Sequence, residues 1–283
     1  MRIRPDVHAI RPGKRPVLNK ALANDRSGFH GDKEQAKALF AALTKRIGQL
    51  QELLYAGHQH KVLIVLQGMD TAGKDGTIRD LCVDAGPQNV RVAAFKVPTL
   101  LELDHDFLWR VHQPMPGKGE LVFFNRSHYE DVVTTRVHGL IPPKRCLRRC
   151  GHINDFERML VDEGTMILKF FLHIDKDEQW ARLKERQEQP DKRWKFHPED
   201  LKERKHWDEY MDAYADAISR TSTRWAPWYV IPANKKWYRN LLVAQTVVRR
   251  LVRFPRTRHL GSKDLLPRRL GRLPAPSADG QPS

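Results

Sequence analysis

The sequence predicts an α/β fold in three layers, with a parallel central sheet between two layers of helices. Five short apolar segments read as buried strands, and stretches of helical periodicity lie between them. Strands that alternate with helices along a chain form parallel sheets whose two faces are covered by those helices. The expected strands are residues 62–66, 90–95, 121–124, 166–174 and 228–231.

The expected helices follow from the spacing of apolar residues in steps of three and four. An amphipathic helix is expected over residues 32–55, before the first strand. Between the strands, helices are expected at residues 74–85, 104–112 and 154–163. A closing helix is expected at residues 234–254, and the residues predicted to face the core are Trp237, Leu241, Val248 and Leu251.

Residues 175–222 interrupt this alternation with two helical stretches around a turn at Pro190. Arg182 and Arg186 stand one helical turn apart in the first stretch, so they share one face of a helix. Further basic residues follow, interleaved with Trp194 and Phe196. The segment therefore presents clustered positive charge on an insertion beside the sheet.

The composition is that of a globular protein large enough to bury a full core. The chain has 283 residues and only three cysteines, which do not make a disulfide framework and fit a reducing cytoplasm. No apolar run approaches the roughly 18 residues of a membrane span. We therefore expect a cytoplasmic protein that does not enter a membrane.

The net charge of +16 is concentrated at the two ends of the chain. Residues 1–30 hold seven Lys and Arg against two Asp and Glu, and residues 249–283 hold nine against two. Charged ends are commonly solvated and mobile. The alternative is that they hold a polyanion near the body of the protein. The high net charge alone does not indicate a nucleic-acid partner.

The sequence GMDTAGKDG, which begins at Gly68 directly behind the first strand, predicts a phosphate-binding loop. Gly68 and Gly73 let the backbone curl so that successive N–H groups point at phosphate oxygens. Lys74 adds a point charge at the start of the next helix, where the helix dipole also favours an anion. Asp75 stands where a nucleotide triphosphatase carries Ser or Thr.

Asp70 and Asp75 suggest a metal ion, because a carboxylate beside phosphate oxygens is repelled unless a cation intervenes. Mg²⁺ is the usual cation, held by one or two carboxylates and the substrate phosphates. Asp75 has an alternative interpretation as an acidic residue favoured by the helix dipole without any metal.

A second polar motif, FNRSHYED, follows the apolar strand at 121–124. Polar residues at the carboxyl end of a central strand project into the crevice where α/β sheets bind ligands. Arg126 there would neutralise charge on a phosphoryl group in transfer. The alternatives are a helix cap and surface salt bridge for Asn125 and Arg126, and ordinary early-helix acids for Glu130 and Asp131.

Together these motifs resemble the polyphosphate kinase 2 family, the polyphosphate-dependent nucleotide phosphotransferases. The resemblance covers roughly residues 30–253 and extends through INDFERML, RLKERQEQPDKRWKF and STRWAPWYVIPANKKWYRN. Many members begin the second motif with Asp, whereas this chain has Asn125. With His128, Tyr129 and Glu130 behind it, Asn125 makes the motif similar to the subgroup that accepts both AMP and ADP.

The resemblance implies a P-loop kinase fold with a helical lid and Mg²⁺-dependent transfer between polyphosphate and AMP, ADP or ATP, with Mn²⁺ as a possible substitute. It implies a homodimer or homotetramer. With the charge distribution, it divides the chain into a basic extension (1–30), a phosphotransferase domain (31–254, lid about 175–222) and a basic tail (255–283). The Pro, Arg, Gly and Ser content of the tail predicts disorder.

The resemblance also implies roles for individual residues. The expected catalytic residues are Lys74, Arg126, Asp70, Arg182 and Arg186. The expected phosphate- and nucleotide-binding residues are Gly68, Ala72, Gly73, Lys74, Asp75, Gly76, Asn125, Arg126 and Glu130. The expected metal ligands are Asp70, Asn125 and Glu130, of which Asn125 is the weaker kind of ligand.

Two other functions remain open from the sequence. An ATP-dependent nucleoside monophosphate kinase of the thymidylate kinase type has a similar loop and lid, but Asp75 and Asn125 argue against it. A non-catalytic polyanion-binding protein would use the basic ends. Cys146, Cys150 and His152 lack a fourth ligand at zinc-site spacing, so ordinary free thiols are expected.

Overall fold

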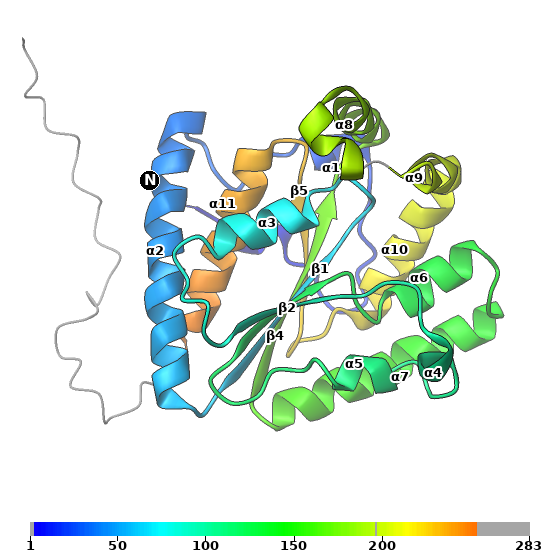
Figure 1. Ribbon diagram of the computed structural model, residues 1–283, viewed down its shortest axis with the longest axis horizontal. Helices are drawn as coiled ribbons and strands as arrows, with labels where there is room; N and C mark the ends of the chain where they lie inside the picture. Colours follow the sequence, from blue (N-terminus) through cyan, green and yellow to red (C-terminus); the bar gives the residue numbers. More distant parts are fainter. Residues whose placement is uncertain (1–2, 196, 254–283) are drawn as a thin grey trace, which may run out of the picture.

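The computed structural model describes residues 3–195 and 197–253. Its strands form one five-stranded sheet in the order β2-β3-β1-β4-β5, in which every neighbouring pair is parallel (Figure 1). This arrangement confirms the predicted fold class. The strands are β1 (Lys61–Gln67), β2 (Val90–Ala94), β3 (Leu121–Asn125), β4 (Thr165–His173) and β5 (Trp228–Pro232).

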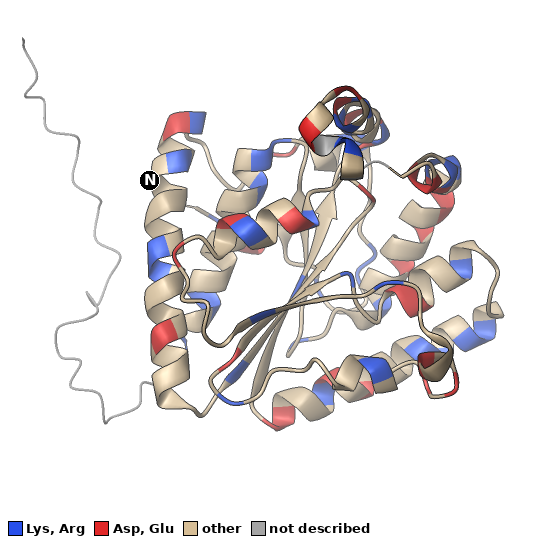
Figure 2. Cartoon of the chain, in the orientation of Figure 1, with Lys and Arg blue, Asp and Glu red and all other residues tan. Residues whose placement is uncertain are grey.

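Helices cover both faces of the sheet and complete the three layers. One layer contains α2 (Lys33–Gly57), α3 (Lys74–Leu81) and α11 (Lys236–Leu251), which contact one another. The other contains α6 (Glu130–Val137), α7 (Pro143–Asp162) and α10 (Trp207–Thr221), which also pack together. Charged residues lie mainly on the helices and loops around the sheet (Figure 2).

The central strands are buried because helices cover both of their faces. Every residue from 62 to 66 in β1 is fully buried, and so are the apolar residues of β3. These strands therefore have continuous apolar runs instead of alternating ones. Of the four residues expected to face the core from the closing helix, Leu241, Val248 and Leu251 are buried and Trp237 packs against the core while partly exposed.

Helix α2 confirms the amphipathic helix expected at 32–55. A capping box starts it: the Asp32 side chain accepts from the Gln35 N–H, and the Gln35 side chain accepts from the Asp32 N–H. The helix ends at Gly57, and the following residue, His58, takes the left-handed conformation with φ of 43°.

The helix predicted at 104–112 was wrong, because only residues 109–112 of this stretch are helical. Helix α4 (Leu100–Leu103) starts earlier, at a capping box between Thr99 and Glu102. The Asp106 carboxylate then accepts a hydrogen bond from the Leu108 N–H at 2.9 Å. Such local side-chain bonding competes with helix formation, and a second turn, α5 (Trp109–His112), follows it.

Helix α7 is longer than the expected stretch at 154–163 and begins at Pro143. Proline is favoured in the first turn, where its missing N–H has no intrahelical partner. Cys146 and Cys150 lie buried on this helix as free thiols, as expected. Helix α3 is shorter than the expected 74–85 and ends at Leu81.

The N-terminal extension packs against the body of the protein from residue 3 onward, which differs from the expectation of a solvated end. It includes a 3₁₀ turn (Pro5–His8), a bridge between Ala9 and Tyr229, and α1 (Lys20–Ala23). Phe29 is 2% exposed in the hydrophobic core. Apolar residues among the charges therefore anchor the segment. The C-terminal tail expected at 255–283 lies outside the described residues.

Residues 175–222 contain three helices and two 3₁₀ turns. They are α8 (Lys176–Glu188), Pro190–Lys195, α9 (Glu199–Glu203), Arg204–His206 and α10. Helix α10 packs against α6 and α7 as part of the sheet's cover, while α8 lies over the end of the sheet (Figure 1). Among the described residues, no helix is both long and apolar enough to cross a membrane.

Candidate phosphate-binding site

The two motifs meet at the carboxyl ends of β1 and β3. These strands are neighbours, and Leu66 of β1 is in register with Asn125 of β3. Parallel strands end at the same edge of a sheet, so the phosphate loop (residues 68–74) and the turn after β3 emerge side by side. The sheet thus joins motifs that are more than fifty residues apart in the chain.

The backbone of the phosphate loop takes conformations that favour glycine at three positions. The φ angles of Gly68, Thr71 and Gly73 are +149°, +69° and +100°. A Cβ at Gly68 would lie 2.7 Å from the carbonyl oxygen of Leu172 in β4. Positive φ at Thr71 costs about 1–3 kcal/mol, a strain that clusters at functional sites.

Lys74 starts α3 and is buried beneath the loop. Its Nζ donates to the carbonyl oxygens of Gly68 at 2.7 Å and Met69 at 3.2 Å. Burial, with repulsion from Arg126, lowers the pKa of Lys74 to about 8. The first-turn amides of α3 have no intrahelical acceptor, so they and Lys74 together favour an anion.

Arg126 brings the second motif to the loop. It also takes a left-handed conformation, with φ of +61°, and its N–H donates to the Leu66 carbonyl at 3.0 Å. Its guanidinium pairs with the carboxylate of Asp70 and lies 3.4 Å from Glu130. Burial opposes the charge, but the carboxylates of Glu130 and Asp70 raise the pKa of Arg126 above its ordinary value.

The carboxylates of Asp70 and Glu130 are both paired with Arg126. Burial would raise the pKa of Asp70, but Arg126, Lys74 and Arg186 outweigh it and hold that pKa below its usual value. Glu130, the first residue of α6, also accepts from the Thr134 hydroxyl at 2.7 Å.

Asn125 and Asp75 also meet across the site. The Asn125 side-chain N–H₂ donates to the carboxylate of Asp75 in the first turn of α3. Asn125 is the last residue of β3 and does not cap α6, whose N-cap residue is Tyr129. Gly76, in the same turn, and Ala72, fully buried in the loop, complete the expected phosphate-binding stretch.

The two lid arginines of α8 have different surroundings. Arg182 is buried and donates to four backbone carbonyls, those of Thr71, Ala72, Ala233 and Asn234. Arg186 lies 3.6 Å from the carboxylate of Asp200 on α9. The structure thus places Arg182 against the phosphate loop and Arg186 beside Asp200 of α9, and the charge of Arg186 helps to lower the pKa of Asp70.

Sequence reasoning missed two charged residues of this region. Asp200 is 9% exposed, and burial together with the charge of Asp70 raises its pKa to about 6. Arg239 of α11 is 2% exposed and donates to the Ala72 carbonyl at 3.1 Å. Helical periodicity gives no signal for either residue, since it identifies apolar positions and both of these side chains are charged.

A metal ion fits the chemistry of these side chains. Asp70 and Glu130 offer carboxylate oxygens on the same guanidinium, and Asn125, whose side chain contacts Asp75, offers an amide oxygen. Within the described ranges, no group of three or more His, Cys, Asp or Glu gathers around one point. Mg²⁺ does not need such a group, because it is held by one or two carboxylates plus substrate phosphates and water.

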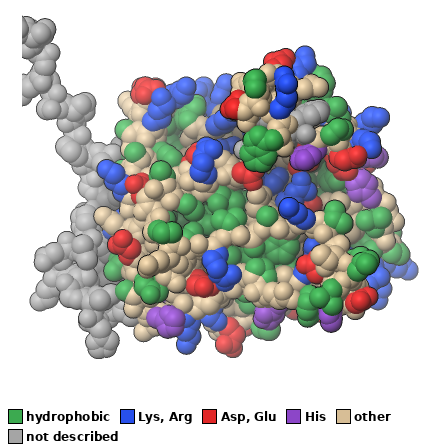
Figure 3. Space-filling model, in the orientation of Figure 1, with side chains coloured by type: hydrophobic (Ala, Val, Ile, Leu, Met, Phe, Trp, Pro, Cys, Tyr) green, Lys and Arg blue, Asp and Glu red, His purple; other side chains and the backbone are tan. Residues whose placement is uncertain are grey.

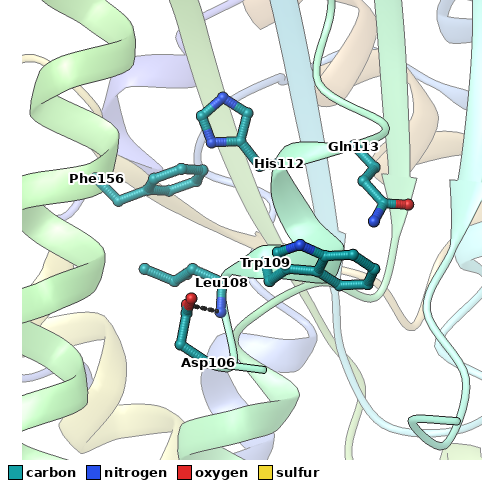
Figure 4. A pocket seen from close by; sticks show the side chains of 6 residues that line it. All are labelled: Asp106, Leu108, Trp109, His112, Gln113 and Phe156. Atoms are coloured by element: carbon teal, nitrogen blue, oxygen red, sulfur yellow. Dashed lines mark hydrogen bonds between the residues drawn. The ribbon is translucent and has the colours of Figure 1, made fainter. Parts of the chain in front are cut away.

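Other surface features lie apart from these residues. An open pocket of about 430 Å³ lies between α5 and α7 (Figure 4). Its lining residues are Asp106, Leu108, Trp109, His112, Gln113 and Phe156. A hydrophobic area occupies the middle of one face (Figure 3). Exposed apolar residues of the protein include Val92 of β2 and Val97, which follows it in the chain.

A parallel sheet with a glycine-rich loop after its first strand, and with an arginine from the neighbouring strand end on that loop, defines a P-loop kinase-like protein. Comparison with known proteins narrows the class. The sequence model of the Polyphosphate kinase 2 family matches residues 30–257. The chain belongs to the polyphosphate kinase 2 family.

Individual relatives agree with this assignment. An AMP/ADP-polyphosphate phosphotransferase of Meiothermus ruber is 57% identical over 244 residues, covering 86% of this chain and 91% of that protein. An ADP-polyphosphate phosphotransferase of Rhodopseudomonas palustris is 40% identical over 84% of this chain and 88% of that protein. The crystal structure of polyphosphate kinase 2 from Arthrobacter aurescens superposes with a TM-score of 0.85 at 43% identity, covering 88% of this chain and 89% of that one.

Proposed function

We propose that this protein transfers phosphoryl groups reversibly between inorganic polyphosphate and adenine nucleotides, from AMP to ADP and from ADP to ATP. The observation that carries the proposal is the contact between Arg126 and Asp70, which joins the second motif to the phosphate loop. The names of the Meiothermus and Rhodopseudomonas relatives support both the donor and the acceptors.

The reaction exchanges one phosphoanhydride bond for another. A terminal phosphate oxygen of the nucleotide attacks the last phosphorus of polyphosphate, and the bond between that phosphorus and the chain breaks. The attacking oxygen is ionised at neutral pH, so no general base is needed. Both substrates are polyanions, and the main contribution of the protein is to offset their repulsion and align them.

Each side chain of the site has a part in that alignment. The loop amides and Lys74 would hold the donor phosphates, and Arg126 would bind the transferred group as it exchanges its present carboxylate partners for phosphate oxygens. Arg186 would approach from α8. Closure of α8 and α9 over the loop would exclude water, the competing acceptor.

Mg²⁺ is the proposed metal, with Mn²⁺ as a substitute, and Asp70, Asn125 and Glu130 are its proposed ligands. When bound, it neutralises phosphate charge beside the carboxylates. Cytoplasmic location and assembly into a homodimer or homotetramer remain predictions from the sequence.

The proposal is tested by incubating the protein with polyphosphate and each of AMP, ADP and GDP, with Mg²⁺, with Mn²⁺ and with excess chelator. We expect ADP and ATP as products with either metal, none with chelator, and polyphosphate formation from ATP in the reverse direction. Absence of ATP from ADP under every metal condition contradicts the proposal. Transfer from ATP to a nucleoside monophosphate without polyphosphate would favour the thymidylate kinase type of activity instead.

A polyanion-binding protein without catalytic activity is the second alternative left open by the sequence. Removal of residues 255–283 separates it from the proposed enzyme. A tail-dependent binder loses its binding, whereas the enzyme retains transfer to ADP, since the phosphate loop and Arg126 lie within the described body of the chain.

A further inference from the structure

Two buried arginines from different helices converge on one carbonyl of the phosphate loop. Arg182 of α8 and Arg239 of α11 lie 3.2 Å and 3.1 Å, Nη1 to oxygen, from the Ala72 carbonyl. Ala72 stands two residues before Lys74. The two guanidinium groups therefore contact the loop through its carbonyl groups.

Arg182 connects the loop to the segment after β5. Its Nη1 also donates to the Thr71 carbonyl at 2.9 Å, and its Nη2 donates to Ala233 at 2.7 Å and Asn234 at 3.0 Å. The Asp70 carbonyl accepts from Gln179 on the same helix at 3.3 Å. Three consecutive loop carbonyls are thus held by side chains outside the loop.

Arg239 connects the loop to α3. Its Nε donates to the Asn240 side-chain oxygen at 2.9 Å, and Asn240 in turn donates to the Asp80 carboxylate at 2.7 Å. Asp80 is on α3, the helix that Lys74 begins. The position of Arg239 is therefore fixed relative to the first turn of α3.

Gly73 shows how closely the loop and Arg239 fit. A Cβ at this position would lie 1.8 Å from Arg239 Nη1, a distance that no pair of nonbonded atoms adopts. A side chain at position 73 would therefore displace the Arg239 guanidinium, and the φ of +100° also favours glycine there.

Placing two cations side by side in a buried position is costly. Burial and the nearby charge of Arg182 lower the pKa of Arg239 to about 10. Apolar side chains of similar volume avoid this cost and often stabilise a protein. Hydrogen bonds to the loop carbonyls and an ion pair between Arg182 and Glu178 offset part of this cost. The two charges also add positive potential next to an anion-binding loop.

We propose that Arg239 and Arg182 are positioning residues for polyphosphate binding. They hold the carbonyls of Thr71 and Ala72 on the outer side of the loop, which leaves the loop amides to face the phosphate chain. This assigns Arg182 an action through the loop instead of direct contact with the transferred phosphoryl group. The inference rests on the proposed function for the identity of the anion.

The test compares Arg239→Met, Arg239→Lys and Arg182→Met with Arg149→Met as a matched control. Arg149, on α7, is also a largely buried arginine, and it donates to the backbone carbonyl of Asp131 at 2.7 Å. It makes no hydrogen bond to the phosphate loop among those of the described residues. Four quantities are measured for each variant: the thermal midpoint, the dissociation constant for tripolyphosphate without nucleotide, KM for polyphosphate and KM for ADP.

We expect Arg239→Met and Arg182→Met to weaken tripolyphosphate binding by about 10- to 100-fold, the usual effect of removing a residue that orients a ligand-binding group. KM for ADP should change much less, and Arg239→Lys should recover part of the binding because it keeps the charge. Arg149→Met should bind tripolyphosphate as the wild type does, whatever its loss in thermal midpoint.

Equal tripolyphosphate affinity in Arg239→Lys, Arg239→Met and the control would overturn the proposal. If Arg239→Met does not fold, the tripolyphosphate affinities of Arg239→Lys and Arg182→Met are compared with that of the Arg149→Met control instead. The binding measurement does not depend on turnover. Wild-type protein that binds tripolyphosphate but makes no ATP would count against the proposed function and leave the role of the two arginines intact.

Discussion

The guanidinium of Arg126 pairs with the carboxylate of Asp70, although 56 positions separate them in the sequence. Arg126 belongs to the turn after β3 and Asp70 to the loop after β1. The two side chains neutralise each other in the present structure. A bound phosphate oxygen would compete with Asp70 for the arginine, and a bound metal ion would compete with Arg126 for the carboxylate. The predictions below concern this arrangement and the core that supports it.

Lys74→Ala should lower the rate of ATP formation by about 10² to 10³, since it removes one preorganised charge from the donor phosphates. The thermal midpoint should change little by comparison. Initial rates at saturating polyphosphate and ADP measure the effect. Near-full activity in the variant would show that Lys74 does not contact the reacting phosphates.

The pH profile should reveal the ionisation of Lys74. With a pKa of about 8, its charge is complete below that pH and is lost as pH rises through it. We therefore expect kcat/KM for polyphosphate to fall above pH 8, because this parameter reports the free enzyme. The decrease in kcat should occur at a higher pH than the decrease in kcat/KM, since bound phosphate favours the charged form of Lys74.

The lowered pKa of Lys74 also has a consequence for stability. Lys74 binds its proton more tightly in the unfolded chain than in the folded protein. Its contribution to the free energy of unfolding therefore rises as the pH increases from about 8 towards the Lys74 pKa in the unfolded chain. For the activity profile, a kcat/KM for polyphosphate that stays level from pH 7 to 9.5 would contradict a Lys74 pKa of about 8.

Activity should decrease as monovalent salt increases. Polyphosphate releases counterions when it binds cationic side chains, as DNA does, and salt opposes that release. The expected result is a rising KM for polyphosphate between about 50 and 300 mM salt, with a smaller effect on KM for ADP, which carries fewer charges. A KM for polyphosphate that is independent of salt would exclude an electrostatic binding track.

Gly73→Ala should abolish most of the activity. Its methyl group would displace Arg239 from the loop and its φ of +100° would strain the backbone. Gly151→Ala is the control: a methyl group there meets nothing within 4 Å, and alanine is the better helix former in α7. Comparable activities in the two variants would show that the loop tolerates displacement of Arg239.

Lys169→Met should destabilise the protein by about 3–5 kcal/mol, because it leaves Glu157 as an unpaired buried charge. Lys169 and Glu157 are fully buried and 2.6 Å apart, and Lys169 also donates to the Thr221 carbonyl at the end of α10. Urea unfolding measures the loss. The double variant with Glu157→Leu should recover much of it, and a single variant within 1 kcal/mol of wild type would be inconsistent with a buried charge pair.

Sequence periodicity predicted the parallel sheet and its covering helices because both depend on local patterns. The apolar run of β1 and the capping box of α2 are legible without tertiary information. The helix expected at 104–112 failed for a local reason too: one hydrogen bond, from the Leu108 N–H to Asp106, competes with the helix and leaves no trace in the apolar spacing.

By itself, the amino-acid sequence determined which segments form strands, where the phosphate loop lies, and which family the motifs resemble. The tertiary structure alone decided which groups meet: Arg126 with Asp70, Asn125 with Asp75, and Arg239 with the Ala72 carbonyl of the phosphate loop. The physical reason is that helix and strand formation depend on neighbours along the chain. A contact across the site depends instead on strand order, and Arg239 reaches Ala72 only after α11 has packed beside α3.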